Sequence, residues 1–247
     1  MPQSFWADYH VHTRYSDGRA AAREMVAAAR RAGLATVALT DHGPRNLGVG
    51  VYSARAFLKL KREVASWDTA GIRVLVGAEA NIVGLEGEID LPEEIYSQLD
   101  LLLVGLHPYV LPVNLQAACD LVLANQLQHI SKRWREKALA ANTASLLAAL
   151  EKHPVFCLTH PGLGMPVEIE TLARACARAG TAWEVNVGHL YQRPQELALA
   201  ARCGVKFVVN SDAHQPATVG NLEAGWQLLQ AAGIEPEQVL NFSRAAR

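Results

Sequence analysis

Short apolar stretches alternate with helix-like stretches from one end of the chain to the other, and this alternation constrains the fold more than any other feature of the sequence. The apolar stretches are nearly continuous, which predicts strands buried on both faces, as in a parallel sheet covered by helices. Repeated strand–helix units are typical of α/β folds. The expected strands are residues 5–12, 35–40, 72–78, 101–106, 155–158, 183–187 and 206–210.

The segments between these strands have the composition and end signals of helices. Residues 20–32 are rich in alanine and end at Gly33, and residues 53–70 are amphipathic and end at Gly71. Glycine commonly caps the C-terminus of a helix. The longest connection, 114–152, predicts two helices with a break near 128–130. The other expected helices are residues 91–98, 168–179, 194–202 and 222–232.

Seven strands separated by helices favour a closed or nearly closed (β/α) barrel that forms one domain over residues 1–247. The length of 247 residues lies in the range that α/β barrels occupy as a single domain. Half of the residues are hydrophobic, which suffices for a large core. No internal repeat, low-complexity tract or Ser/Gly linker marks a second domain.

Charge and cysteine content restrict the partners and the compartment. The chain has 23 Lys and Arg against 24 Asp and Glu, so its net charge favours neither a long nucleic acid nor a membrane surface as a partner. The four cysteines form no CxxC pair and are typical of buried thiols in a reducing compartment. With no signal-peptide pattern at the N-terminus and no apolar run long enough to cross a bilayer, we expect a cytoplasmic protein.

His10 and His12 end the first expected strand with one residue between them. Side chains alternate along a strand, so the two imidazoles share one face and suggest a metal site. Six of the seven strands end in a His, Glu or Asp in this way, and in a (β/α) barrel these ends meet at one rim, where active sites form. The further candidates are Asp17, His42, Glu79, His107, His160, Asp212 and His214.

Each candidate taken alone has an ordinary structural explanation. A histidine beside a strand is more often a hydrogen-bonded structural residue, and Asp17-Gly18 is typical of a turn. Turns and surface residues do not explain six strand ends of the same kind. The convergence therefore favours the metal-site hypothesis.

The motifs resemble those of the polymerase-and-histidinol-phosphatase (PHP) superfamily of metal-dependent phosphoesterases. They occur in that family's order, as HVHTRYSDG, LTDHG, GAEAN, GLH, LTHPG, EVNVG and NSDAH. The resemblance covers nearly the whole chain, and it is strongest to the free-standing phosphatases, which share Asp41-His42-Gly43-Pro44 and Glu79-Ala80-Asn81. It implies a distorted (β/α)7 barrel and two to three divalent metal ions.

The resemblance also implies how the nine residues divide among three ions. The first set is His10, His12, Glu79 and Asp212, the second is Asp17, His42 and His214, and the third is Glu79 as a bridge with His107 and His160. Imidazole and carboxylate ligands without cysteine suit zinc, manganese or iron. Asp17 stands where some of these phosphatases have a third histidine, and its harder carboxylate favours manganese, iron or magnesium over zinc at that position.

The implied reaction is hydrolysis of a small phosphomonoester by a hydroxide bridged between metal ions, without a protein nucleophile. Arginine suits phosphoryl oxygens because it is bidentate and permanently charged. Arg193, after the sixth strand, is the predicted catalytic arginine, and Arg14, Arg45 and His189 are predicted to contact the substrate. His189 is also a candidate proton donor to the leaving group. All four can equally be exposed surface residues.

The sequence leaves open the roles of two further residues, Asp8 and Asp41, and two other functions for the protein. Asp8 and Asp41 precede ligand histidines and either orient the ligands or stabilise turns. A nucleotidase or nuclease acting on mononucleotides or short oligonucleotides fits the same motifs, although the neutral net charge disfavours long polymers. A non-catalytic metal-binding module is the third hypothesis, and retention of all nine ligand positions argues against it. The sequence selects neither one substrate nor an oligomeric state.

Overall fold

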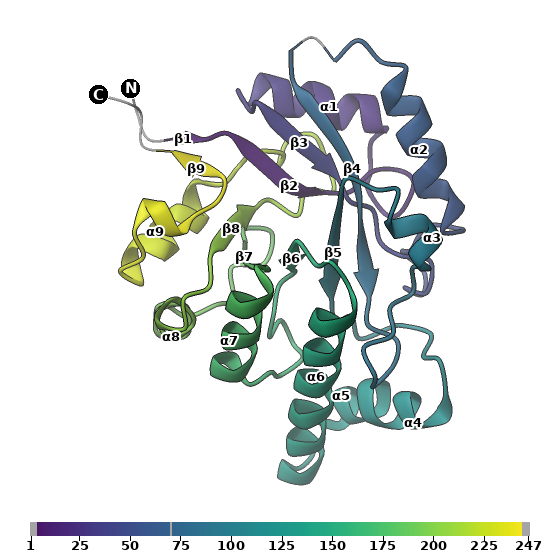
Figure 1. Cartoon of the computed structure of the whole chain (residues 1–247), viewed down its shortest axis with the longest axis vertical. Helices are drawn as coiled ribbons and strands as arrows, with labels where there is room; N and C mark the ends of the chain where they lie inside the picture. The colour runs from purple at the N-terminus through teal and green to yellow at the C-terminus, as the bar shows by residue number, and fades with distance from the viewer. Residues whose placement is uncertain (1–3, 70, 244–247) are drawn as a thin grey trace.

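Seven parallel strands form the centre of the computed structural model, which describes residues 4–69 and 71–243 (Figure 1). Each strand pairs in parallel with the next along the chain. In sheet order they are β2 (Ala7–Val11), β3 (Thr36–Leu39), β4 (Arg73–Asn81), β5 (Leu101–Gly105), β6 (Cys157–Leu158), β7 (Ala182–Asn186) and β8 (Phe207–Asn210). The predicted (β/α)7 barrel is confirmed.

Helices cover the outside of the sheet, as predicted (Figure 1). The predicted break in the longest connection is present, because Ser131 caps a new helix by accepting a hydrogen bond from the Trp134 backbone N–H. The helices are α1 (Ala22–Arg31), α2 (Arg55–Ala65), α3 (Glu93–Tyr96), α4 (Leu115–Ala117), α5 (Ala124–Leu127), α6 (Lys132–Lys152), α7 (Ile169–Ala179), α8 (Pro194–Arg202) and α9 (Glu223–Ala231), with a π-helical turn η1 (Ala118–Leu123) between α4 and α5 and a 3-10 turn η2 (Pro236–Gln238).

The interior of the barrel changes from apolar to polar along the strands. Val37 and Leu39 pack with α1, whereas Ala38 between them belongs to a separate cluster, so that cluster lies on the inner face. Its fully buried members are Ala7, Tyr9, Ala38, Leu103, Cys157, Ala182 and Val208. Two residues further along, the same face is polar, with Glu184 after Ala182 and Asn210 after Val208. Polar side chains therefore gather inside the carboxyl end of the barrel.

Polar side chains close the barrel between β2 and β8, the two ends of the sheet order. The Asn241 amide donates to Ala7 O at 2.8 Å and to Val209 O at 2.6 Å, and accepts from Val209 N at 3.1 Å. Asn210 Oδ1 accepts from Tyr9 N at 3.0 Å. Past the strands, His12 N donates to Ala213 O at 2.9 Å. The barrel is thus nearly closed, and side chains take the place of a strand ladder at this junction.

The predicted first strand is divided in two. Its first part, β1 (Ser4–Phe5), pairs antiparallel with β9 (Phe242–Ser243) outside the barrel, and only β2 enters the parallel sheet (Figure 1). The rings of Phe5 and Phe242 lie 4.8 Å apart, and Trp226 stacks on Phe242 at 4.2 Å. Burial of these rings stabilises a small sheet that joins both ends of the described chain.

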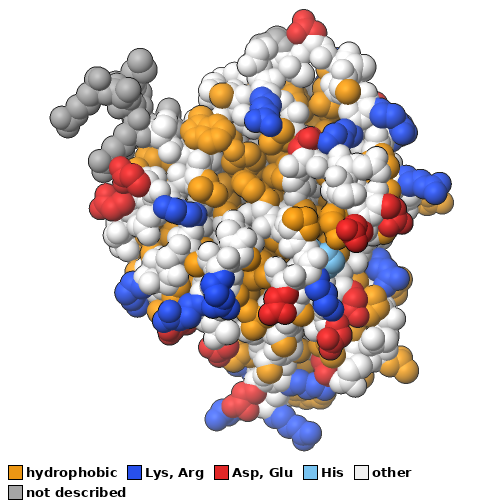
Figure 2. Space-filling model, in the orientation of Figure 1, with side chains coloured by type: hydrophobic (Ala, Val, Ile, Leu, Met, Phe, Trp, Pro, Cys, Tyr) orange, Lys and Arg blue, Asp and Glu red, His pale blue; other side chains and the backbone are white. Residues whose placement is uncertain are grey.

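The four cysteines are free thiols. Cys157 and Cys176 are buried, as predicted, but the prediction of a buried thiol is wrong for Cys119, which is exposed, and Cys203 is half-buried. Within the described ranges every helix is too short or too polar to cross a bilayer. Basic and acidic side chains are interspersed over the face seen in Figure 2, in keeping with the balanced net charge.

Candidate metal centre

The structure brings all nine predicted ligands together at the carboxyl end of the barrel. Glu79, on β4, is fully buried at the centre of this group. Its carboxylate lies within 4 Å of nitrogens of five histidines: His10, His12, His42, His107 and His160. Asp212 joins the group through His10 and His12, and Asp17 joins through His12, His42 and His214.

Three donors of the first predicted set, His10, His12 and Asp212, form a group that can hold a metal ion, and Glu79 lies within 4 Å of the two histidines. His10 Nε2 lies 3.0 Å from His12 Nε2 and 3.2 Å from Glu79 Oε2. Asp212 Oδ1 lies 3.1 Å from His12 Nε2 and 3.6 Å from His10 Nε2. Donors bound 2.0–2.1 Å from a tetrahedral ion lie ~3.4 Å apart, so this spacing fits a bound ion.

The second predicted set is wider and includes a fourth member. Asp17 Oδ2 lies 3.2 Å from His214 Nε2 and 3.9 Å from His42 Nε2. His12 Nδ1 lies 3.9 Å from Asp17 Oδ1, and these four side chains form a group that can hold a metal ion. His12 therefore faces the first set with Nε2 and the second set with Nδ1, which the sequence motifs did not indicate.

The two oxygens of Glu79 face different neighbours. Oε2 lies 3.2 Å from His10 Nε2 and 2.8 Å from His42 Nδ1, whereas Oε1 lies 2.8 Å from His160 Nε2 and 3.4 Å from His107 Nε2. A carboxylate with its oxygens divided between two groups of histidines has the geometry of a bridging ligand. His42 faces Asp17 with its other nitrogen, and it also forms a group with Glu79 and His107 that can hold a metal ion.

Several buried polar atoms in this cluster have no hydrogen-bond partner within the described part of the chain. They are His12 Nδ1, His42 Nδ1, Glu79 Oε2, and Nδ1 and Nε2 of His107. Buried polar atoms are nearly always paired, so a group of unpaired ones indicates a missing partner. Imidazole nitrogens and carboxylate oxygens are the donors that zinc, manganese and iron take. The residues therefore fit divalent metal ions.

The charges in the cluster favour the ionised form of the carboxylates, which is the form that binds a metal ion. Burial raises the pKa of Glu79, but His10, His107 and His42 lower it well below its usual range. Burial also lowers the pKa of His107 to about 4, against the effect of Glu79, so this imidazole is neutral at neutral pH. For His10, burial opposes Glu79, Glu184 and Asp212, which together raise its pKa well above the usual value. Ion binding at His10 Nε2 therefore displaces a proton.

Asp8 and Asp41 form hydrogen bonds to groups that lie next to predicted ligands in the sequence. Asp41 accepts hydrogen bonds from Thr13 N at 2.7 Å and from Ser16 Oγ at 2.6 Å, which holds the turn that precedes Asp17. Asp8 accepts from Ser211 N at 3.1 Å and from Gly220 N at 3.0 Å, beside Asp212. Both carboxylates thus stabilise turns whose next residues are predicted ligands.

His160 and Asp212 have left-handed backbone conformations, with φ of 30° and 52°. No other non-glycine residue among those that the structure describes has a positive φ. Such conformations cost free energy in side-chain-bearing residues and cluster at functional sites, where surrounding contacts hold them. Here they turn two predicted ligands toward the cluster.

Of the predicted catalytic and substrate-contacting residues, His189 lies beside the cluster, and the three arginines form hydrogen bonds elsewhere. His189 Nε2 lies 3.7 Å from Asp212 Oδ2, and its side chain is 53% exposed. The guanidinium groups face other partners: Arg14 donates to Arg19 O, Arg45 to Leu111 O, and Arg193 to Glu196 Oε1 at 2.5 Å. In the described structure none of these three contacts a predicted ligand, so the roles of Arg193, Arg14 and Arg45 stay predictions.

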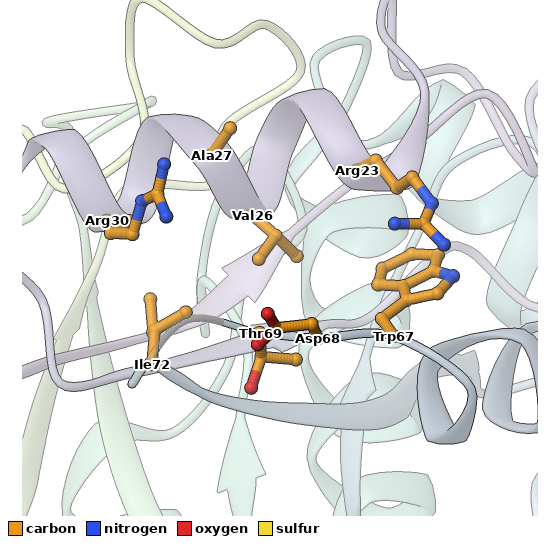
Figure 3. Close-up of a pocket in the computed structure, with 8 residues that line it drawn as sticks. All are labelled: Arg23, Val26, Ala27, Arg30, Trp67, Asp68, Thr69 and Ile72. Atoms are coloured by element: carbon orange, nitrogen blue, oxygen red, sulfur yellow. The ribbon is translucent and has the colours of Figure 1, made fainter.

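Two hollows on the surface outside the barrel lie apart from the cluster. The pocket in Figure 3 lies between α1 and the segment that joins α2 to β4, and Arg23 lies over the Trp67 ring there, 4.5 Å from its centre. A second pocket holds Arg193 with Arg135 and Tyr191. Neither is lined by any of the nine predicted ligands.

Glu184 and Asn186 contact the cluster, but the sequence analysis assigned them no role. Glu184 Oε1 lies 2.7 Å from His10 Nδ1, and Asn186 Nδ2 donates to Asp212 Oδ2 at 3.1 Å. The available signal was their spacing: two polar residues at alternate positions in an otherwise apolar strand point to the same inner face. Their partners lie far away in the sequence, which hid the role.

Asp17 and His214 predict a pH dependence for the metal-free protein. Burial raises the pKa of Asp17, but His214, His12 and His42 lower it from 3.8 to about 2. Burial lowers the pKa of His214, but Asp17 and Asp212 raise it from 6.5 to about 9. The stabilisation from Asp17 is present above pH 3.8 and is lost as the pH falls through about 2. That from His214 is present below pH 6.5 and is lost as the pH rises through about 9.

We therefore expect Asp17→Asn to destabilise the chelator-treated protein most between about pH 4 and 6.5, and much less near pH 9.5. Urea unfolding of both proteins at pH 5, 7 and 9.5 measures the difference in free energy of unfolding. Glu170→Gln is the matched control, because its partner Arg174 stays charged over this range. A difference for Asp17→Asn that is equal at pH 5 and 9.5 would contradict the pairing.

Known proteins of nearly equal length are similar to this chain. The model of the PHP domain family matches residues 8–160. A protein of Syntrophotalea carbinolica named as a probable phosphatase is 30% identical over 246 residues, which cover 95% of this chain and 90% of the relative. The probable phosphatase YcdX of Escherichia coli is 27% identical over 246 residues, covering 96% and 89%.

One solved structure shares the fold over the same extent. It is a histidinol phosphate phosphatase from Lactococcus lactis, determined in complex with zinc, L-histidinol and phosphate. It matches with a TM-score of 0.61 at 17% sequence identity and covers 96% of both chains. At this identity the likeness shows the fold of the chain.

Proposed function

The chain belongs to the PHP domain family, and from this membership we propose that it hydrolyses a small phosphomonoester by means of two to three divalent metal ions. It is a phosphoesterase, in agreement with relatives that match it over nearly its whole length. The finer proposal concerns the substrate class, the number of ions and the residues that hold them. Its main support is Glu79, whose two oxygens face two groups of histidines.

The proposed ligand sets are those that the family resemblance implies, and contacts among the side chains support them in part. His12 and His42 lie between sets and contribute to more than one of them. The first ion would be held by His10, His12, Glu79 and Asp212, the second by Asp17, His42 and His214 beside His12, and the third by Glu79, His107 and His160. Bound divalent ions supply a nucleophilic water at neutral pH and neutralise the charge of the phosphoryl group.

The carboxylates of the cluster explain why the reaction depends on cations. Asp17, Glu79 and Asp212 are ionised at neutral pH, because neighbouring imidazoles lower the pKa of each carboxyl. In the metal-free protein, protonated His10 and His214 balance part of this negative charge, because the same carboxylates raise the pKa of both imidazoles. With metal ions in place of those protons, the site would carry more positive charge and would attract a phosphomonoester dianion.

His189 is the proposed proton donor to the leaving group. It lies at the rim of the cluster, with Nε2 3.7 Å from Asp212 Oδ2, and its backbone N–H donates to Asn186 Oδ1 at 3.1 Å. Its exposed imidazole is accessible to a substrate while its backbone is held in place. Positioned histidines commonly transfer protons in this way.

A phosphomonoester panel tests the proposal. Protein loaded separately with zinc, manganese or iron is offered amino-alcohol phosphates including histidinol phosphate, sugar phosphates, mononucleotides and a short oligonucleotide. Released phosphate is measured for the monoesters, and shortened products are measured for the oligonucleotide. We expect kcat/KM for the best monoester to exceed that for the oligonucleotide by about 100-fold or more. A preference for mononucleotides would identify the nucleotidase alternative. No phosphate release with any metal would overturn the proposal.

We also propose a cytoplasmic location. The four free thiols support it, because disulfides are rare in reducing compartments. Detection of the native protein in the soluble cytoplasmic fraction of its host cell is the expected result.

A further inference from the structure

Glu184 is a buried carboxylate below the ligand cluster, and both of its oxygens are occupied. Oε1 lies 2.7 Å from His10 Nδ1 and 2.9 Å from Asn210 Nδ2. Oε2 lies 2.6 Å from His160 N and 3.1 Å from Asn186 Nδ2. Glu184 has no exposed surface, so solvent does not compete for these contacts.

Three of the four partners present an N–H group to Glu184 for reasons independent of it. His160 contributes a backbone amide. Asn210 uses its Oδ1 to accept from Tyr9 N, and Asn186 uses its Oδ1 to accept from His189 N, so the amide nitrogens of both face Glu184. Three N–H groups thus converge on the two carboxyl oxygens of Glu184, which accept from all of them.

The fourth contact then defines which nitrogen of His10 faces the metal site. With an ion on Nε2, the one ring nitrogen of His10 that can carry a proton is Nδ1, which lies 2.7 Å from Oε1 and donates to it. This leaves Nε2 as the nitrogen that lies 3.0–3.6 Å from His12, Glu79 and Asp212. A histidine fixed in this way has its lone pair aimed at the ion.

The same carboxylate holds the strained backbone of His160 and is linked through Asn186 to the side chain of Asp212. Oε2 accepts from the N–H of His160, whose φ is 30°. Asn186 Nδ2 lies 3.1 Å from Glu184 Oε2 and 3.1 Å from Oδ2 of Asp212, whose φ is 52°. Contacts from the surrounding structure are needed to keep such conformations populated. Glu184 thus connects ligands of the first and third sets.

We propose that Glu184 is a positioning residue for the metal centre: by accepting four hydrogen bonds it fixes the metal-facing nitrogen of His10 and the left-handed turn at His160. The inference rests on the proposed metal-dependent function, but it concerns metal affinity and can be tested apart from turnover. Groups that orient a metal ligand commonly change metal affinity by about 10- to 100-fold.

Glu184→Gln tests the proposal with nearly unchanged shape. The amide oxygen replaces one acceptor, but the NH2 group faces two of the four N–H donors and accepts from neither. We expect the zinc and manganese dissociation constants, measured by competition with a chromophoric chelator, to rise about 10- to 100-fold. Glu184→Asp keeps an acceptor-only charge and is expected to recover part of the affinity. Glu170→Gln, on the surface of α7, is the matched control.

The outcomes separate this inference from the proposed function. Unchanged metal dissociation constants in folded Glu184→Gln, with a wild-type protein that hydrolyses phosphomonoesters, would overturn the positioning role alone. A wild-type protein that binds metal and releases no phosphate would overturn the proposed function alone, while the affinity comparison still reports on Glu184.

A measurement on the wild-type protein covers the case in which Glu184→Gln does not fold. Long-range 1H–15N spectra of the zinc-loaded protein, with His10 assigned from the spectrum of His10→Gln, distinguish the two ring nitrogens. We expect a protonated Nδ1 and a metal-bound Nε2. A protonated Nε2 in the loaded protein would refute the proposal.

Discussion

Replacing Glu79 by glutamine will lower kcat/KM for phosphomonoester hydrolysis on the order of 10³-fold, because several kcal/mol of charge stabilisation by the metal ions depends on this carboxylate. Glu79 is fully buried, and nitrogens of five histidines lie within 4 Å of its oxygens. Glutamine keeps the shape and removes both the charge and one acceptor oxygen. The metal content should fall by about one ion or more per chain, measured by elemental analysis.

The large loss of activity expected for Glu79→Gln comes from the position of Glu79 between two groups of histidines. Removal of His107 affects only the set around Oε1, where His107 Nε2 lies 3.4 Å away. We therefore expect His107→Asn to retain more metal than Glu79→Gln. Glu170→Gln, an exposed substitution of the same kind on α7, should keep wild-type kcat/KM and metal content. Glu79→Gln with more than a tenth of the wild-type kcat/KM would contradict a bridging role.

The barrel could be predicted because the apolar composition of each strand indicates that the strand is buried on both faces. Near-continuous apolar stretches such as 101–106 specify a strand covered on both faces, and Gly33 and Gly71 mark the ends of the helical segments. Parallel strands of a barrel then place all their carboxyl ends at one rim. The convergence of the nine predicted ligands follows from these local patterns together with the order of the motifs.

The contacts that close and support the site could not be predicted from local patterns. Asn241 joins β2 to β8 through hydrogen bonds to Ala7, 234 residues away, and to Val209. Glu184 meets donors from positions 10, 160, 186 and 210, which come together only in the folded barrel. Periodicity identifies Glu184 as an inward polar residue, but its partners depend on tertiary structure.

The role of Arg193 was hard to predict for a different reason. Glu196, which competes with a phosphate for its guanidinium, lies nearby in the sequence. Glu196 is the third residue of α8, and its carboxylate accepts from Arg193 N at 3.1 Å and from the guanidinium at 3.0 Å. A Glu three residues after a helix N-cap commonly turns back in this way. The spacing Arg193–Glu196 therefore indicated a helix-capping contact that competes with the predicted role in phosphate binding.

Removal of the metal ions will lower the melting temperature of the protein by about 8–16 °C relative to protein with an ion at 1,000 times its dissociation constant. Binding at that concentration stabilises the folded state by about 4 kcal/mol. Each kcal/mol shifts the melting temperature of a domain of this size by about 2–4 °C. The structural reason is the grouping of buried carboxylates and imidazoles without hydrogen-bond partners, among them Glu79 Oε2 and His12 Nδ1. A bound ion satisfies these atoms and offsets the repulsion between Glu79 and Asp212, each of which opposes ionisation of the other carboxyl.

Differential scanning calorimetry of chelator-treated protein, titrated with zinc, manganese or iron, measures the shift, and elemental analysis gives the number of ions bound. We expect two to three equivalents per chain and a shift that decreases as the pH falls below about 9, because protons compete for imidazoles such as that of His214. His129→Gln is a matched histidine control, since His129 lies between α5 and α6 outside the predicted ligand sets. Well under one equivalent after purification without chelators, with no shift on titration, would instead favour the non-catalytic module, because the proposed hydrolysis depends on bound ions.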